Sequence, residues 1–403
     1  MTVKTSDSPK ELKTAFTGFI SLLGSSVISA LGFIMIASNR VVEIESATAV
    51  FIILFVQWQI LGLTIAKTGI EQVVFAAVTE NANLFFKPAK YVYQKAMPLA
   101  GVFACVISFT FSPWAAVVAF GSIVLDTYSL IVMADLNARK AFKITALSNL
   151  LNYPLFFSII FAVNFYGKLT VNLMLSAFLL SSLVRLLWLE HHRIVLPEMQ
   201  EVVCKANVAM GGQQALNYLL FRIDQLLLAI VALKMVTPEN AGMYVFLAKF
   251  PELVSGVMVV AGSVLFPARY IKYPFSSKDI FKILKKYAVF IAGYFTAILL
   301  AFYAYLHLWK GTGIPWHLVV PFFVHSLCIV LVNNISYSAL RQGYLHRLLL
   351  NLLYSVLTGL FLGAIIFVNF NVGSLSLIVP AQLLLFVTLS LVMGWGQRKE
   401  LYG

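Results

Sequence analysis

The amino-acid sequence predicts an all-α integral membrane protein of about twelve transmembrane helices, arranged as two pseudo-symmetric six-helix lobes around a central cavity. Composition predicts the class, because 61% of the 403 residues are hydrophobic, 11% are charged and the mean hydropathy is +0.90. Apolar segments of about twenty residues recur along the chain, as bilayer-spanning helices require. Lysines and arginines cluster in alternate connections, which predicts the orientation.

Each apolar segment is long enough to cross a hydrocarbon core of about 30 Å at about 1.5 Å per residue. The first segment is too long for the core of a signal peptide and lacks a convincing cleavage site, so it is predicted to be a span. The predicted spans are 14–38, 47–69, 92–112, 115–137, 143–165, 169–189, 207–232, 240–266, 287–307, 315–337, 348–369 and 374–396.

The cations predict that both termini are cytoplasmic. The N-terminus, the even-numbered connections and the C-terminus carry 22 of the 29 lysines and arginines, with Arg185 counted among them. The odd-numbered connections carry four, which are Arg40, Lys168, Lys234 and Lys310. The positive-inside rule therefore places the N-terminus, the even-numbered connections and the C-terminus in the cytoplasm. The formal net charge of +13 comes mostly from the lysines and arginines that mark the cytoplasmic ends of the spans. We therefore expect no nucleic-acid partner.

Several function classes are excluded. Every outside connection is short, so the chain has no room for an external catalytic loop and is not expected to be an enzyme. Cys105, Cys204 and Cys328 have neither disulfide nor metal-ligand spacing. We expect no metal or organic cofactor.

The remaining interior polar residues are expected to form hydrogen bonds that pack helices together. They include His325, Asn149, Asn152, Asn333, Asn334 and Asn351.

The two predicted lobes are residues 1–198, with spans one to six, and residues 199–403, with spans seven to twelve. A shift of 194 residues aligns ESATAVF at 45–51 with ENAGMYV at 239–245, and it pairs Gly62 with Gly256. An even number of spans per half gives parallel repeats, a common plan for transporters. Chance similarity of apolar segments is the alternative.

The seventh span carries a cation and an anion, Arg222 and Asp224, among leucines in ALNYLLFRIDQLLLAIVAL. Residues two apart on a helix do not face each other. Arg222 continues a stripe with Gln214, Tyr218 and Gln225. Asp224 continues a second stripe with Gln213 and Asn217. Charges at this depth are costly unless they face protein or water, so this helix is predicted to lie inside the bundle.

Three further charged residues are predicted to lie well inside the bilayer. Lys249 and Glu252 share one face of the eighth span, at about the depth of Arg222, and Pro251 between them is predicted to bend the helix. Asp126 lies near the centre of the fourth span and is the candidate for binding a coupling proton or sodium ion, with Glu252 as the second. Two roles remain open for the seventh- and eighth-span charges: a polar cavity for an anionic ligand, or a structural network between helices.

The segment FRIDQLLLAIVALKMVTPENAGMYVFLAKFPEL at 221–253 resembles the start of the second half of polysaccharide flippases in the multidrug/oligosaccharidyl-lipid/polysaccharide exporter superfamily. In that pattern an Asp is followed by leucines, a short loop and a Gly-aromatic-x-x-Ala start of the next span. Here these residues are Asp224, Leu226–Leu228, Gly242 and Ala248. Two six-span lobes, short outside loops and cytoplasmic termini extend the resemblance over the whole chain.

The resemblance, to Wzx-type O-antigen flippases in particular, implies a multi-pass protein of a bacterial inner membrane. Its substrate would be an undecaprenyl-diphosphate-linked oligosaccharide, moved to the periplasmic leaflet by alternating access. Arg222 and Lys249 would bind the diphosphate, while Tyr218, Gln214, Gln225 and Asp224 would line the sugar site. A polysaccharide polymerase or assembly complex is the implied protein partner.

The basic segment RYIKYPFSSKDIFKILKKYA at 269–288 is predicted to be an interfacial amphipathic helix on anionic membrane lipid, or a plain positive-inside loop. Other function classes remain as alternatives. One is another transporter of the same fold, such as a cation-coupled drug antiporter or a peptidoglycan-precursor flippase. Another is a membrane-embedded enzyme that modifies polysaccharide.

Overall fold

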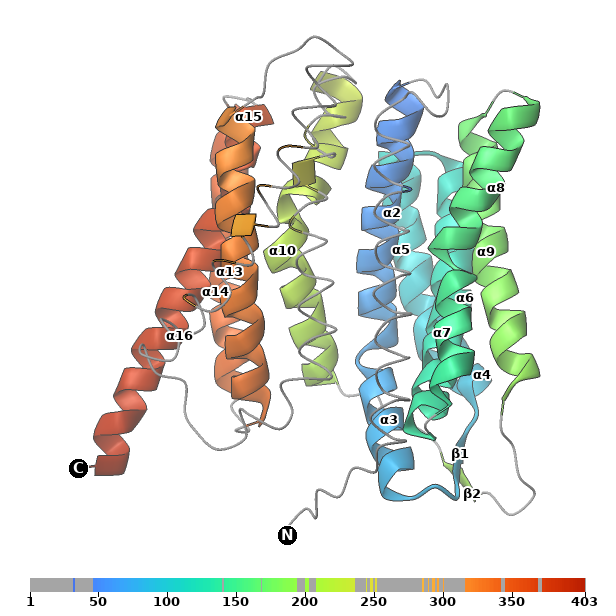
Figure 1. The fold of residues 1–403 in the computed structure, drawn as a ribbon, viewed down its shortest axis with the longest axis horizontal. Coiled ribbons are helices and arrows are strands. Elements are labelled where there is room, and N and C mark those ends of the chain that lie inside the picture. The colour runs from blue at the N-terminus through green and yellow to red at the C-terminus, as the bar shows by residue number, and fades with distance from the viewer. Residues whose placement is uncertain are drawn as a thin grey trace. The chain divides into compact units, whose positions relative to one another are not determined.

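The computed structural model describes residues 46–139, 141–167, 169–193, 200–202, 208–235, 316–341, 345–368 and 372–402, with single positions elsewhere. Within these ranges the chain is almost entirely helical (Figure 1). The first predicted span and most of the eighth and ninth lie outside the described residues, as do Lys249, Glu252 and most of the basic segment at 269–288.

The helices and strands follow the apolar segments of the sequence closely. In chain order they are α2 (Ser46–Lys67), α3 (Ile70–Glu80), β1 (Leu84–Phe86), α4 (Pro88–Tyr91), η1 (Val92–Ala96), α5 (Met97–Thr110), α6 (Pro113–Ala138), α7 (Phe142–Leu150), α8 (Tyr153–Tyr166), α9 (Val171–His191), β2 (Gln200–Val202), α10 (Val208–Met235), α13 (Trp316–Arg341), α14 (Leu345–Val368), α15 (Val372–Leu375) and α16 (Ile378–Tyr402).

Six helical segments in the described part are long and apolar enough to cross a membrane: Val50–Lys67, Pro88–Thr110, Pro113–Ala138, Lys143–Tyr166, Val171–His191 and His346–Ile366. They match the predicted second to sixth and eleventh spans. The predicted class, a helical protein with several membrane-spanning segments, is therefore confirmed. The total of twelve spans and the cytoplasmic termini stay predictions.

The chain divides into two compact units. Unit 1 consists of Met1–Gly32, Val42–Ile44 and Trp58–Gly211, and unit 2 consists of Phe33–Val41, Glu45–Gln57 and Gly212–Gly403. The long helix α2 contributes its first part to unit 2 and its second part to unit 1. The lobe boundary predicted at residues 198 and 199 stays a prediction.

Helix α6 is the centre of unit 1, because α3, α5 and α9 all pack against it. Ser112 begins this helix as an N-cap, with its Oγ accepting a hydrogen bond of 3.1 Å from the Ala115 amide, and Pro113 follows at the first position. Most of α6 is buried, whereas α5 exposes large apolar side chains such as Val102 and Phe109. An apolar outer face is what lipid contact requires.

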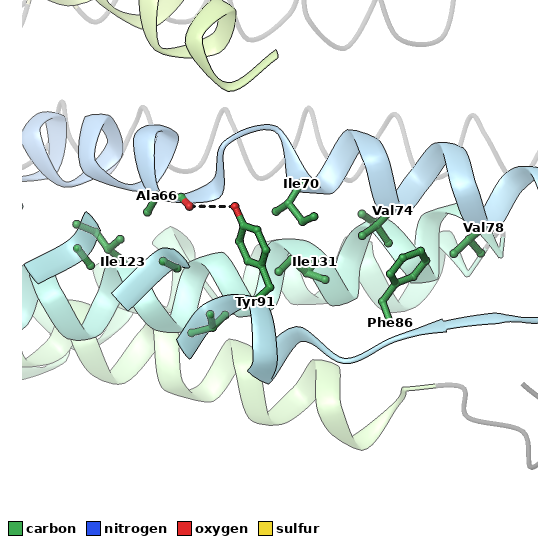
Figure 2. Close-up of a cluster of buried hydrophobic side chains, with 12 residues drawn as sticks. Ala66, Ile70, Val74, Val78, Phe86, Tyr91, Ile123 and Ile131 are labelled. Carbon is green, nitrogen blue, oxygen red and sulfur yellow. Dashed lines mark hydrogen bonds between the residues drawn. The ribbon is translucent and has the colours of Figure 1, made fainter. Parts of the chain in front are cut away.

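The helix of the second span is interrupted at Thr68 and Gly69, where both residues have positive φ angles of 41° and 71°. Tyr91 stabilises the break, because its hydroxyl donates to the Lys67 carbonyl at 2.8 Å and to the Ala66 carbonyl at 3.3 Å. These carbonyls end α2 and would otherwise lack partners. Figure 2 shows Tyr91 among the buried side chains that pack α3 against α6.

Two predicted spans prove to be broken helices. The fifth span, predicted as continuous over 143–165, is α7 and α8 with a break at Leu151 and Asn152, and Pro154 begins α8. The twelfth, predicted as 374–396, is α15 and α16 with a break at Ser376 and Leu377, just before Pro380. Proline explains both positions, since it lacks the amide that would bond the carbonyl four residues earlier and its ring clashes with that carbonyl.

A short parallel strand pair joins two connections that are far apart in sequence. Strand β1 pairs with β2 so that Leu84 lies opposite Gln200 and Phe86 opposite Val202. Lys87 and Glu201 add an ion pair of 2.5 Å, and the Arg193 guanidinium lies 4.4 Å from the centre of the Phe85 ring. The segment that leads from α9 towards α10 is thereby fastened to the loop after α3.

In unit 2, helices α13 and α14 both pack against α16. Asn351 of α14 donates to Ser390 of α16 at 3.3 Å, which is the packing role expected for this asparagine. Gln382 of α16 is completely buried and donates to the carbonyls of Leu219 and Leu220 in α10. Gln382 thus ties α10 to α16.

Candidate polar sites

Helix α10 carries the polar stripes that the sequence places in the seventh span. Its 28 residues run unbroken, with Arg222 and Asp224 near the middle. Asp224 is 1% exposed and Gln225 is also buried, whereas Arg222, Tyr218 and Gln214 are half-buried. The two charged side chains therefore have different environments on one helix, as expected from the roughly 200° between residues two apart.

Asp224 binds a neighbouring segment. Its Oδ2 accepts a hydrogen bond of 2.6 Å from the hydroxyl of Tyr244, a residue of the predicted eighth span. The Tyr244 ring packs edge-on against Phe322 of α13, with 5.3 Å between ring centroids. Tyr244 is itself fully buried. Asp224 therefore holds a tyrosine that bridges α10 and α13.

Tyr218 binds the first part of α2. Its hydroxyl donates to the Gln57 carbonyl at 2.6 Å and lies 2.8 Å from the Gln57 Oε1 atom. Gln57 is 2% exposed and belongs to unit 2 with Tyr218. Arg222 lies one turn further along the same face of α10. This face offers an aromatic hydroxyl, amides and a guanidinium inside one unit.

His325 lies in the same unit, on α13, one turn after Phe322. The side chain is 3% exposed, and neither ring nitrogen has a hydrogen-bond partner among the described residues. Among the described residues, Arg222 acts on it electrostatically. The interhelical hydrogen bond expected for this histidine is not formed within the described part of the chain.

Unit 1 contains a separate buried charge pair. Asp126 of α6 lies 3.6 Å from the Arg185 guanidinium of α9, and both residues are at most 5% exposed. The other carboxylate oxygen of Asp126 accepts a hydrogen bond of 3.2 Å from Gln59 of α2. Ser129 and Ser182 are fully buried nearby on the same two helices. Asp126, the predicted coupling-ion residue, is therefore neutralised by a cation of its own unit.

Sequence reasoning missed Arg185, because it was counted with the cations of an even-numbered connection. The structure places it inside α9, buried, and not in a connection. The signal was present in the sequence, since Ser182 and Arg185 are three residues apart and share one helix face. A helical-wheel reading of the sixth span would have found this polar face.

Charges at the helix ends form local pairs. Lys67 and Glu71 lie 2.6 Å apart at the break between α2 and α3, and Arg139 pairs with Asp135 at the end of α6. Within the described ranges no three His, Cys, Asp or Glu side chains gather in a way that could hold a metal ion. The predicted site residues Lys249 and Glu252 fall outside those ranges.

No protein-family model matches the chain, and no curated protein matches it in sequence. Solved structures match it over nearly its whole length. The eukaryotic MATE transporter AtDTX14 gives a TM-score of 0.57 at 10% identity, with 95% of this chain and 94% of that chain covered.

Two further structures give TM-scores of 0.50 at 14% identity. An outward-facing multidrug resistance MATE family transporter of the MOP superfamily covers 98% of this chain and 100% of its own. A MOP superfamily transporter from Pyrococcus furiosus covers 98% of both chains. At these identities the likeness is one of fold. The chain therefore has a fold similar to that of these transporters.

Proposed function

We propose that the protein is a membrane transporter that flips a lipid-diphosphate-linked oligosaccharide, such as an O-antigen repeat unit, from the cytoplasmic to the periplasmic leaflet of a bacterial inner membrane. The observation that carries the proposal is Arg222, a half-buried cation in the middle of α10, in a chain with a transporter fold. A permanently charged guanidinium inside a membrane span is costly unless it faces protein or water, and its planar group can bind two phosphate oxygens at once.

The roles of the predicted site residues follow their environments in unit 2. Arg222 binds the diphosphate, with Lys249 as the second cation. Gln214 and Gln225 hydrogen-bond the sugars with Tyr218, whose ring offers an apolar face. Asp224 positions Tyr244 and acts on substrate through it. The lipid tail stays in the bilayer, and alternating access moves the head group.

A second candidate is an ion-coupled exporter of small molecules, because a multidrug resistance MATE family transporter is among the proteins with a similar fold. Two buried carboxylates, Asp126 and Asp224, favour it, because such groups bind protons or cations. Arg222 argues against organic cations as its substrate. The Pyrococcus furiosus protein, described as having a binding pocket of reverse polarity and a different function, is a precedent for such divergence within this fold.

Complementation tests the proposal. The gene is deleted in its host and restored as wild type, Arg222→Ala, Arg222→Lys or Lys95→Ala at matched membrane abundance. Lys95 is an exposed cation at a helix end and is the matched control. We expect Arg222→Ala to abolish surface polysaccharide while lipid-linked sugar accumulates inside, Arg222→Lys to restore it in part, and Lys95→Ala to behave as wild type. Normal surface polysaccharide after full deletion, in a host with no second flippase, would refute the flippase function.

A further inference from the structure

Two buried serines of unit 1, Ser129 of α6 and Ser182 of α9, lack the hydrogen bond that other buried hydroxyls of these helices make. Ser122 of α6 and Ser181 of α9 each donate to a carbonyl of their own helix, at 3.2 Å and 2.8 Å. Ser129 and Ser182 are equally buried, at 0% exposure, but their hydroxyls have no partner among the described residues. A buried hydroxyl without a hydrogen bond is costly, so each of the two needs a partner.

Helix geometry places both serines at the Asp126–Arg185 pair. Asp126, Ser129 and Met133 follow i, i+3, i+7 on one face of α6. Arg185 of α9 contacts both ends of this row, because its Nη2 atom donates to the Met133 Sδ atom at 2.8 Å and its Nη1 atom lies 3.6 Å from the Asp126 Oδ1 atom. Ser129 therefore lies between the two groups that the guanidinium contacts. Ser182 lies one turn before Arg185 on the same face of α9.

The ion pair itself has unpaired atoms. Its separation of 3.6 Å is longer than the roughly 2.7–2.9 Å of a direct charge-assisted hydrogen bond. The Asp126 Oδ1 atom and the Arg185 Nε atom are buried and have no hydrogen-bond partner within the described part of the chain. A polar contact longer than about 3.5 Å calls for a bridging water molecule to be considered.

The four unpaired atoms define the chemistry of a ligand that would satisfy them. The carboxylate oxygen is an acceptor, the Nε–H group is a donor, and each serine hydroxyl can be either. A cation at this position would be repelled by Arg185, and an anion would be repelled by Asp126. The matching ligand is a small neutral molecule that both donates and accepts hydrogen bonds, and water is the smallest such molecule.

We propose that Asp126, Ser129, Ser182 and Arg185 form an internal water-binding site between α6 and α9. The bound water accepts from the Arg185 Nε–H group and donates to the Asp126 Oδ1 atom, and the serine hydroxyls complete its hydrogen bonds. Buried waters typically make about three such bonds to groups that otherwise lack partners. The site is independent of the proposed substrate, because all four residues belong to unit 1.

X-ray radiolytic footprinting of the purified full-length protein in lipid nanodiscs tests the site. Radicals formed from a bound water oxidise side chains that bulk solvent does not reach, and methionine is readily oxidised. Met133 is the reporter, because it contacts Arg185 and is only 8% exposed. Met174, a buried core residue of α9, is the internal control. Isotope-labelled water identifies the source of the added oxygen.

The variants remove or retain the unpaired hydroxyls. Ser129→Val/Ser182→Val fills the site with methyl groups, and Ser129→Ala/Ser182→Ala removes both hydroxyls. Ser122→Ala/Ser181→Ala is the matched control, because these two hydroxyls already have partners on their own helices. Size-exclusion profiles and melting curves select the variants that fold, and either of the two hydroxyl-free variants suffices.

We expect wild-type Met133 to be oxidised several-fold faster than Met174, with oxygen taken from the labelled water. The hydroxyl-free variants should lose most of this difference, whereas Ser122→Ala/Ser181→Ala should keep it. Sodium and chloride should not protect Met133, because the pair of opposite charges leaves no net charge for either ion.

Three results would overturn the water site. One is oxidation of Met133 no faster than that of Met174 in the wild type. Another is a wild-type rate at Met133 in a folded variant without both hydroxyls. The third is protection of Met133 by sodium or chloride, which would assign the site to an ion. None of these results concerns surface polysaccharide in the deleted host, so the flippase proposal stands or fails separately.

Discussion

At the scale of single residues, Arg222 and Asp224 show how one helix separates two charges. Asp224 is 1% exposed and accepts from Tyr244, while Arg222 remains half-buried on another face. A helix that crosses a membrane tolerates both charges because each meets polar groups of its own unit. Helix α10, the predicted seventh span, is therefore both a structural element and the candidate binding surface.

The Tyr244–Asp224 hydrogen bond should stabilise unit 2. We expect Tyr244→Phe and Asp224→Ala each to lower the unfolding free energy by about 1.5–3 kcal/mol, because a buried bond to a charged group is lost. The double variant should cost clearly less than the sum, since both changes remove one interaction. Equilibrium unfolding in detergent measures all four proteins. Additive costs would show that the two groups do not interact.

The Asp126–Arg185 pair should follow the rule for buried ion pairs. Asp126→Asn or Arg185→Gln alone leaves an uncompensated charge, and we expect a loss of about 3–5 kcal/mol. The double variant Asp126→Asn/Arg185→Gln should recover most of this loss, because no charge is left unpaired. Thermal unfolding of the single and double variants provides the comparison. A double variant as unstable as the two singles combined would contradict the pairing.

The sequence was informative about residues where helix geometry alone decides. It predicts separate faces for Arg222 and Asp224, which the burial of the two side chains bears out. It could not predict that Tyr244 would bind Asp224 or that Arg185 would pair with Asp126, because both contacts join different helices. Such pairings depend on how helices pack, which spacing along one helix does not contain.

At the scale of elements, the first turn of α10 lies in close contact with the break after α2. A Cβ atom added at Gly211 would lie 2.6 Å and 2.8 Å from backbone atoms of Thr68, which cannot move as a flexible side chain does. The neighbouring Gly212 has room, with its nearest such contact at 3.9 Å. Thr68 is also fixed by Tyr91, whose hydroxyl binds the end of α2.

Gly211→Ala and Gly212→Ala form a matched pair of variants. We expect Gly211→Ala to lower the melting temperature, because the helix must shift away from Thr68. We expect Gly212→Ala to be neutral or slightly stabilising. Alanine in place of a helical glycine with space around it stabilises the folded protein by about 0.5–1 kcal/mol. The melting temperatures of the two purified variants are compared with that of the wild type. Equal effects would mean that the contact with Thr68 does not constrain α10.

Hydropathy predicts where these elements lie but not where they break. The predicted spans 47–69 and 143–165 are continuous in hydropathy, so hydropathy alone does not show the interruptions at Thr68–Gly69 and Leu151–Asn152. Pro154 and Pro380 were the available signals for two of the breaks. The pairing of β1 with β2 had no local signal, since its strands are three residues each and more than a hundred residues apart.

At the scale of the whole molecule, each unit holds a buried charge centre. Unit 1 contains Asp126 with Arg185, and unit 2 contains Asp224 with Tyr244. The substrate site is proposed for unit 2, so a coupling ion bound at Asp126 would act from a different unit. This division makes the coupling role of Asp126 separable from substrate binding.

Transport in proteoliposomes tests that separation. We expect a proton or sodium gradient to accelerate flipping of a fluorescent lipid-diphosphate sugar by the wild type. The charge-free variant Asp126→Asn/Arg185→Gln should flip it at a rate that no longer responds to either gradient, because the ion has lost its carboxylate. Its affinity for farnesyl diphosphate should remain that of the wild type, since Arg222 is unchanged. A variant that still responds to the gradient would remove Asp126 from the coupling step, while lost affinity would show that the centre in unit 1 also governs the binding site in unit 2.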